Sequence, residues 1–170
     1  MSEWMPEMVT HAYWGKKGKF LYDTDTYLTW VLFAVEDGRF EYQIGNEYGE
    51  AVFGDIVVCP PYVAFYRNTL SPISFHAITF TFTNDKNQSL SNLLPEHKIT
   101  VQQTKRLSEN YHHLRVADQV MHYNLNNQRL KQHYFLDLWL MIIQQNMQHL
   151  EMNPLPSCGK RLHSNARTRT

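Results

Sequence analysis

Bulky apolar side chains recur at every second position along two stretches in the first half of the chain. The stretches run from Phe75 to Phe82 and from Phe40 to Ile44. Successive side chains of a β-strand point to opposite faces, so this alternation predicts two strands, each with one buried face. The expected inward faces carry His76, Ile78, Phe80 and Phe82 in one strand and Phe40, Tyr42 and Ile44 in the other.

A third run, Tyr27 to Val35, is apolar on both faces. Such a strand must be covered on both sides, and we expect the interior of a barrel on one side and a helix on the other. Turn signals rich in Gly, Asp, Asn and Pro separate the runs between Phe20 and Thr83 at short intervals. This spacing predicts an antiparallel sandwich or barrel.

A compact corner is predicted at Gly54-Asp55, followed by the apolar residues 56–59 and by Pro60-Pro61. Glycine accepts the positive φ of a tight turn, and an aspartate side chain there can bond the following backbone amides. The two prolines cannot donate to a sheet, so they end the strand.

The second half of the chain changes to helical spacing. One helix is expected from Thr104 to Leu125 and a second from about Gln128 to Met152, with a polar connection over 84–98 that includes a short helical turn at 90–94. The second helix is apolar on nearly every side between Phe135 and Ile143, so it needs two partners. The stripe of the first helix consists of Leu107, Tyr111, Leu114, Ala117 and Met121.

Composition narrows the class of protein. With 170 residues and 43% hydrophobic content, the chain suits one domain with a substantial core. Its two cysteines indicate no disulfide framework, and no apolar run is long enough for a membrane helix, so we expect a cytoplasmic protein. Four basic residues follow Met152, which leaves the first 152 residues at a formal charge of about −4 and without an electrostatic footprint for nucleic acid.

The order of these elements resembles the effector-binding half of bacterial AraC-type transcription regulators, over roughly residues 10 to 150. The resemblance implies a cupin-like (jelly-roll) β-barrel followed by two antiparallel helices, a mainly β fold with α. The corresponding parts are an amino-terminal arm (1–19) with a short strand near His11 to Trp14, the barrel (20–100), the dimerisation helices (101–152) and a disordered tail or linker (153–170).

The resemblance also implies a function: a small molecule, most simply a sugar, binds inside the barrel, and the helices pair two subunits. DNA would be bound only through a domain that this chain does not contain, whether by truncation or as a natural short form. The effector, the promoter and the choice between activator and repressor stay open. The expected dimer interface consists of Leu114, Met121, Phe135, Leu138 and Ile142.

Six side chains are the candidates for contact with the effector. His76 and Tyr42 follow from clean alternation, and Arg67 shares a face with Phe65, where a guanidinium needs a carboxylate, a carbonyl or a ligand. Each aromatic residue taken alone is more commonly part of a core, whereas the set together could line a cavity in which an aromatic face stacks on a sugar ring. The complete set is Trp30, Tyr42, Phe65, Arg67, His76 and Phe80.

Cupin enzymes hold a metal with histidines and a glutamate on barrel strands, and the matching segments here contain Tyr42, Ile44, Phe65 and Tyr66 instead. We therefore expect no metal, no cofactor and no catalytic residue. Two alternatives remain open: a metal-free cupin sugar isomerase or epimerase with His76 and a tyrosine as acid and base, and a non-catalytic carbohydrate-binding module.

Overall fold

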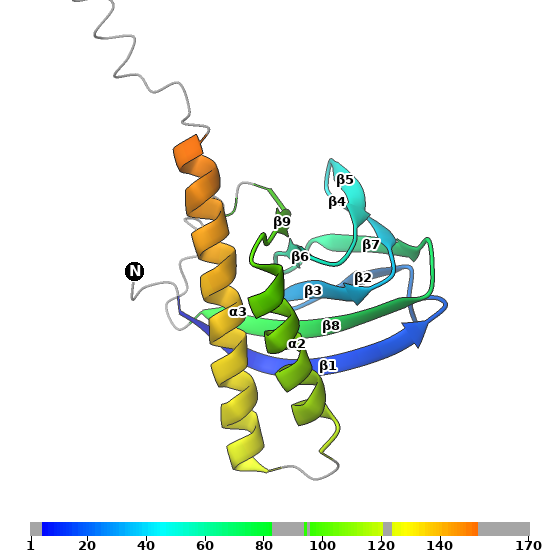
Figure 1. Cartoon of the computed structure of the whole chain (residues 1–170). Coiled ribbons are helices and arrows are strands. Elements are labelled where there is room, and N and C mark those ends of the chain that lie inside the picture. The colour runs from blue at the N-terminus through cyan, green and yellow to red at the C-terminus, as the bar shows by residue number, and fades with distance from the viewer. Residues whose placement is uncertain (1–4, 83–93, 95, 121–123, 153–170) are drawn as a thin grey trace, which may run out of the picture.

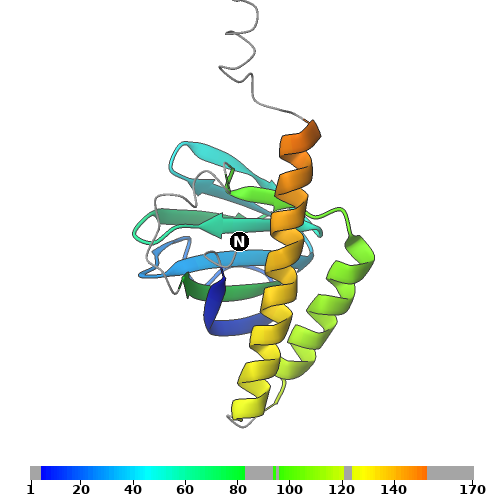
Figure 2. The same ribbon diagram turned by 90° about the vertical axis from the view of Figure 1, so that its left-hand side faces the viewer.

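Two antiparallel sheets face each other, and two helices cover the outer face of one of them (Figure 1). The computed structural model describes residues 5–82, 94, 96–120 and 124–152. The predicted fold class, a jelly-roll-like β-structure followed by two helices, is confirmed. Figure 2 shows that both helices lie on the same side of the sandwich.

The five-stranded sheet has the order β1-β8-β3-β6-β9, and the four-stranded sheet has the order β2-β7-β4-β5. The first sheet consists of β1 (Pro6–Lys17), β8 (Ile73–Phe82), β3 (Trp30–Asp37), β6 (Asp55–Cys59) and β9 (Lys98–Thr100). The second consists of β2 (Thr24–Thr26), β7 (Ala64–Thr69), β4 (Phe40–Ile44) and β5 (Glu47–Ala51). The helices are α2 (Thr104–Asp118) and α3 (Leu125–Met152).

Strand β3 is buried on both faces, as its sequence predicts. Val31, Phe33 and Val35 point into the space between the two sheets, whereas Leu32 and Ala34 point toward the helices. The described residues therefore form two hydrophobic cores that share one sheet.

The core between the sheets is packed with side chains. Phe33 lies at its centre, with ring centroids 4.9 Å from those of both Phe65 and Phe75. The inward faces predicted for β4 and β7 are confirmed, because their alternate residues are buried here. The apolar members of this core include Phe20, Val31, Phe33, Val35, Phe40, Tyr42, Ile44, Val57, Cys59, Phe65, Ile73 and Phe75.

Arg67 is a charged residue within this aromatic core, and only 4% of it is exposed. Its Nε donates to the carbonyl oxygen of Tyr22 (3.1 Å), and its Nη1 donates to the hydroxyl of Tyr27 (3.2 Å). Asp25 supplies a carboxylate 3.9 Å away. The guanidinium also lies over four aromatic rings, those of Phe20, Tyr27, Phe33 and Phe65, so the protein itself satisfies the charge.

The second core lies between the five-stranded sheet and the helices. Phe135, Leu138 and Ile142 of α3 and Leu114 of α2 are completely buried in it. This position corrects the predicted dimer interface, because these four side chains pack within their own chain. The apolar band on α3 is wide enough to contact both the sheet and α2. The sequence alone could not show which side of the helix stays exposed. Met121 lies outside the described residues.

Several boundaries differ from those predicted. The expected short strand at His11–Trp14 is part of the longer β1, which pairs with β8 along most of its length. Helix α2 ends at Asp118 rather than at Leu125, and α3 begins at Leu125. The predicted turn at 90–94 and the predicted tail at 153–170 fall almost entirely outside the described residues. No helix in the described ranges has the length and apolar character needed to span a membrane.

The corner at Gly54-Asp55 forms with Gly54 at φ +100°. Asp55 Oδ2 accepts a hydrogen bond from the amide of Val52 (3.0 Å), which precedes it, rather than from a following amide as expected. Its Oδ1 accepts from the Thr100 hydroxyl (2.6 Å), so the corner also fixes β9. β6 ends at Cys59, directly before the two prolines, as predicted.

Gly38 gives a first testable prediction, since it has φ +84° and a Cβ built on it would lie 2.1 Å from the carbonyl oxygen of Pro72. Gly38→Ala should lower the free energy of unfolding by about 3 kcal/mol, because positive φ and a backbone clash act together. Gly45→Ala is the matched control: φ is +58° with open space around the glycine, so it should cost only about 1 kcal/mol. Urea titrations of both variants measure the difference, and equal losses would contradict the packing at Gly38.

Arg67 gives a second prediction. Arg67→Met should lower the free energy of unfolding by about 2 kcal/mol, because Tyr22 and Tyr27 lose a charged donor and methionine restores none of these bonds. Arg39→Met is the control, because Arg39 lies on the surface about half-exposed, 3.8 Å from Glu50, and should change stability by less than about 0.5 kcal/mol. If Arg67→Met is as stable as the wild type, the guanidinium is available for a ligand instead.

Candidate functional site

The six predicted effector residues do not converge on one cavity. Tyr42, Phe65 and Arg67 lie in the core between the sheets, whereas Trp30, His76 and Phe80 lie on the other face of the five-stranded sheet, toward the helices. Alternation correctly placed His76 and Phe80 on a common face of β8. It could not show that the helices, and not the sandwich interior, cover that face.

Tyr42 is already hydrogen-bonded within the protein. Its hydroxyl donates to Glu47 Oε2 (3.0 Å), and the same carboxylate accepts the amide of His97. Burial, followed by the negative charge of Glu47, raises the pKa of Tyr42. The tyrosine is therefore a neutral hydrogen-bond donor with its partner in place.

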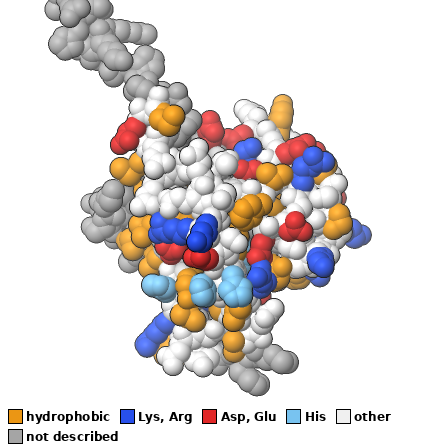
Figure 3. Space-filling model, in the orientation of Figure 1, with side chains coloured by type: hydrophobic (Ala, Val, Ile, Leu, Met, Phe, Trp, Pro, Cys, Tyr) orange, Lys and Arg blue, Asp and Glu red, His pale blue; other side chains and the backbone are white. Residues whose placement is uncertain are grey.

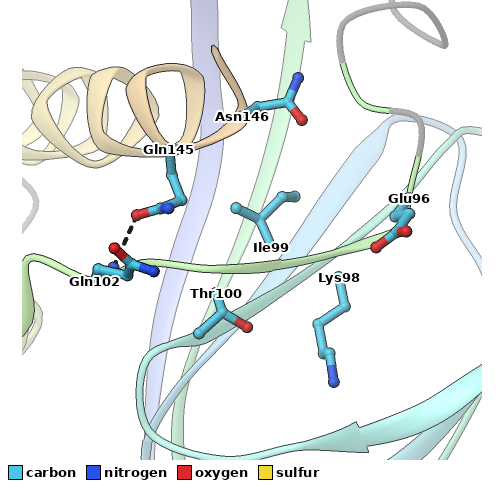
Figure 4. A pocket seen from close by; sticks show the side chains of 7 residues that line it. All are labelled: Glu96, Lys98, Ile99, Thr100, Gln102, Gln145 and Asn146. Atoms are coloured by element: carbon cyan, nitrogen blue, oxygen red, sulfur yellow. Dashed lines mark hydrogen bonds between the residues drawn. The ribbon is translucent and has the colours of Figure 1, made fainter. Parts of the chain in front are cut away.

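A pocket of about 260 Å³ lies between β9 and the carboxy-terminal part of α3 (Figure 4). Its strand side includes Ile99 and Thr100, and its helix side consists of Gln145 and Asn146. Gln145 Oε1 accepts a hydrogen bond from the backbone amide of Gln102 (2.9 Å), which joins the two walls. Among the described residues, the lining consists of Glu96, Lys98, Ile99, Thr100, Gln102, Gln145 and Asn146.

The chemistry of this lining suits a small polar molecule. Amide, hydroxyl, ammonium and carboxylate groups can donate to or accept from hydroxyl groups on a ligand. Ile99 adds an apolar surface. The volume is slightly below the range of roughly 300–1,000 Å³ that is usual for drug-sized ligands. The pocket therefore favours binding of a compact ligand.

A second polar constellation is buried between the sheet and the helices, around two histidines. His11 Nε2 on β1 and His76 Nδ1 on β8 are 3.0 Å apart. His76 Nε2 lies 3.4 Å from Glu36 Oε2 on β3, and His11 Nδ1 lies 3.8 Å from Asp118 Oδ1 on α2. The order Glu36, His76, His11, Asp118 thus forms a row of titratable groups across three strands and a helix.

A cation stands next to each carboxylate of this row. Arg115 of α2 pairs with Glu36, and Lys131 of α3 donates to Asp118 Oδ1 (3.0 Å). The His76 ring also contacts the aromatic rings of Tyr13 and Tyr111, with centroid distances of 5.1 and 4.9 Å. Asp118 Oδ2 also accepts the backbone amide of Tyr13 (3.0 Å), so it holds strand β1 directly.

Burial determines the charges in this row. Burial, with repulsion from His76 and Lys131, lowers the pKa of His11 to about 3, and burial also lowers the pKa of His76. Burial opposes ionisation of Glu36 as well, but the nearby His76 ring and the Arg115 guanidinium outweigh it and lower the pKa of that carboxyl. The pKa of Asp118 is lowered against burial by Tyr13 and Lys131. At neutral pH the row holds two neutral imidazoles between two compensated carboxylates.

Sequence reasoning missed most of these residues. The pocket joins positions that are 43 residues apart, and no local pattern distinguishes Gln102 or Gln145 from other surface glutamines. The histidine row had one local signal, since His76 was the only polar residue on an otherwise apolar strand face. Its partner His11 is contributed by a strand that was predicted to be short and part of an arm. Among the described residues, no three His, Cys, Asp or Glu side chains are placed to hold a metal ion together.

No protein-family model matches the chain, and no curated protein matches it. Among solved structures, the chain is similar to ToxT from Vibrio cholerae, an AraC-family regulator, with 11% identity over 84% of this chain and 58% of that one, and a TM-score of 0.43. It is also similar to YhaK from Escherichia coli, with 15% identity over 57% of this chain and 44% of that one, and a TM-score of 0.41.

A cupin-superfamily protein from Desulfitobacterium hafniense shows 11% identity over 42% of this chain, with a TM-score of 0.36. The match spans 63% of that protein, which is less than two thirds of its length. Identities this low transfer no function, so the function is argued below from the residues of this chain.

Proposed function

We propose that the chain is the ligand-sensing and dimerisation domain of an AraC-type bacterial transcription regulator, acting in the cytoplasm without catalysis or a metal. It binds a small polar molecule, most simply a sugar. DNA is contacted only through a DNA-binding domain outside this chain. The observation that carries the proposal is the pocket whose two walls belong to the sheet and to α3.

We propose the pocket beside β9 as the ligand site, in place of the barrel interior that the sequence predicted. That interior holds close-packed aromatic rings and the internally paired Arg67, so a ligand would have to displace core side chains. The pocket beside β9 needs no such displacement, because a volume of about 260 Å³ already lies between its two walls.

The pocket connects ligand binding to the helices. The Gln102–Gln145 hydrogen bond is one link between β9 and α3, and an occupant would either bridge the two walls or compete for this bond. In both cases the ligand binds one placement of α3 better than another, which is the requirement for a shift between conformations.

The outer face of α3 is the proposed surface for pairing two subunits. Leu136, Leu140, Ile143 and Met147 follow one another at steps of four, three and four residues, which places them along one stripe. Leu140 and Met147 are more than two fifths exposed, whereas Leu136 is partly buried and Ile143 packs against the core that holds Leu138 and Ile142. Leu140 and Met147 therefore form the exposed part of this stripe. A second copy of α3 could cover it by helix-to-helix packing.

The enzyme alternative requires an accessible His76, but this side chain is completely buried against two tyrosines. A sensor is therefore the better proposal for this geometry. The carbohydrate-binding module differs from it only by lacking a link between ligand and oligomer, which the experiments below distinguish.

Binding in the pocket is tested with a panel of monosaccharides, by thermal shift and calorimetry, while product formation is followed. We expect at least one sugar to bind without turnover. Gln102→Ala should weaken it about five- to tenfold, roughly 1–1.4 kcal/mol, because one polar contact is lost.

Gln148→Ala is the matched control for this test, since Gln148 is exposed on α3 and does not line the pocket. Turnover of a sugar would favour the isomerase or epimerase. Sugar binding that neither variant alters would place the ligand elsewhere, and a panel without any binder would contradict the sugar.

Dimerisation is tested by sedimentation at micromolar concentration. The wild type should sediment as a dimer and Leu140→Glu as a folded monomer, because a charge on the stripe cannot be buried without a partner. Leu130→Glu is the control: Leu130 is similarly exposed but lies about 110° around the helix from the stripe, so this variant should remain a dimer. A monomeric wild type would contradict the proposed pairing.

A further inference from the structure

The two buried histidines need three protons to donate a hydrogen bond to both neighbouring carboxylates, and their surroundings favour only two. The two rings carry four nitrogens: the His11–His76 bond uses one N–H, and the remaining nitrogens face Asp118 and Glu36. Both carboxylates receive an N–H only if the pair carries three protons, which makes one ring an imidazolium.

With two protons, one end of the row stays unsatisfied. If His76 Nε2 donates to Glu36, then His76 Nδ1 accepts from His11 Nε2, and His11 Nδ1 presents a lone pair toward Asp118. In the opposite tautomer the lone pair faces Glu36. His11 Nδ1, His76 Nε2 and Glu36 Oε2 are indeed buried without a hydrogen bond of good geometry.

The charges around the row disfavour the third proton. Glu36 of β3 faces Arg115 of α2, and Asp118 of α2 faces Lys131 of α3. Each carboxylate is already compensated, so an imidazolium would add an uncompensated buried charge. The other titratable groups against the pair are the phenols of Tyr13 on β1 and Tyr111 on α2. Burial raises the pKa of Tyr111, so that phenol adds no negative charge.

Strand β1 is the element whose position depends on this row. It is an edge strand, and on its far side it is held by side chains from the helices: Asp118 accepts the amide of Tyr13, and Gln132 bonds both Met8 and Pro6. Separation of β1 from β8 and the helices would expose His11 and His76 to water, where each has a pKa near 6.5.

We propose that the His11–His76 pair is a proton-operated latch, which keeps β1 on β8 and the helices while both rings are neutral and releases it when the opened form takes up protons. The latch shares no residue with the pocket beside β9, so it does not rest on the proposed function. Its ligand is the proton, and its output is the attachment of the amino-terminal strand to α2 and α3.

The direction of the pH effect follows from proton linkage. Below pH 6.5 the opened form binds more protons than the closed form, so the closed form loses stability as the pH falls. Each histidine that is neutral when closed and has a pKa of 6.5 when open raises the opening constant about tenfold between pH 7.5 and 5.5. Both together give about 100-fold. Glu36 and Asp118 do not contribute in this window, because their ordinary pKa values lie below it.

The experiment is native-state hydrogen exchange of the whole chain at pH 7.5, 6.5 and 5.5, corrected for the intrinsic exchange rates. The amides that join β1 to β8 should lose about 100-fold in protection, and those between β4 and β5 should lose far less. His11→Gln should retain about a tenfold change, and the double variant with His76→Gln should retain almost none. Exposed histidines also gather over the helices (Figure 3). His133→Gln, which alters an exposed histidine on α3, is the control and should behave as the wild type.

A measurement on the wild type keeps the test decisive if the double variant does not fold. Nitrogen-15 spectra of the histidine rings should show His11 and His76 as neutral, fixed tautomers at pH 5.5. The latch is overturned if both buried rings titrate near 6.5 in the closed protein. It is equally overturned if β1 protection changes less than threefold across the range, or if the 100-fold change persists in the double variant.

Discussion

Both faces of strand β3 are apolar and must be shielded from water, and most of the architecture follows from this constraint. One face needs the second sheet, and the other needs the helices, so neither the sandwich nor the helical pair has a complete core alone. The apolar surface buried on the two faces is the main source of stabilisation, at roughly 25 cal/mol per Å². Polar groups in these layers must therefore find partners within the protein, and His11, His76 and Glu36 do so only in part.

The two layers accommodate their polar groups in different ways. Arg67 keeps its charge, because aromatic faces, a carbonyl and a phenol surround the guanidinium. The histidines on the opposite face are neutral, because burial lowers their pKa values and the cations beside them already compensate both carboxylates. One sheet thus separates a permanent buried cation from a pair of titratable neutral rings.

The sequence predicted the features that depend on local periodicity. The strands around Phe40–Ile44 and Phe75–Phe82, the corner at Gly54 and the two helices all formed, since each is specified by a repeat or a turn signal. It could not show which of the two cores a strand face belongs to. Alternation shows only which residues share a face, and both cores are apolar. The same ambiguity placed His76 in the wrong layer and Leu138 at a subunit interface. The pocket between β9 and α3 arises only when distant segments meet, so no local pattern could reveal it.

Gln132 has a role that extends beyond the fold of a single molecule. On the side of β1 that faces away from β8, its side-chain amide accepts a hydrogen bond from the Met8 N–H and donates one to the Pro6 carbonyl oxygen. Asp118 accepts the Tyr13 N–H on the same side. An exposed edge strand offers such groups to any other extended segment and is a template for aggregation. The helices thus protect the sheet from adding foreign strands. A fragment that ended before residue 104 would leave this edge open, and intermolecular β-pairing would be its characteristic mode of failure.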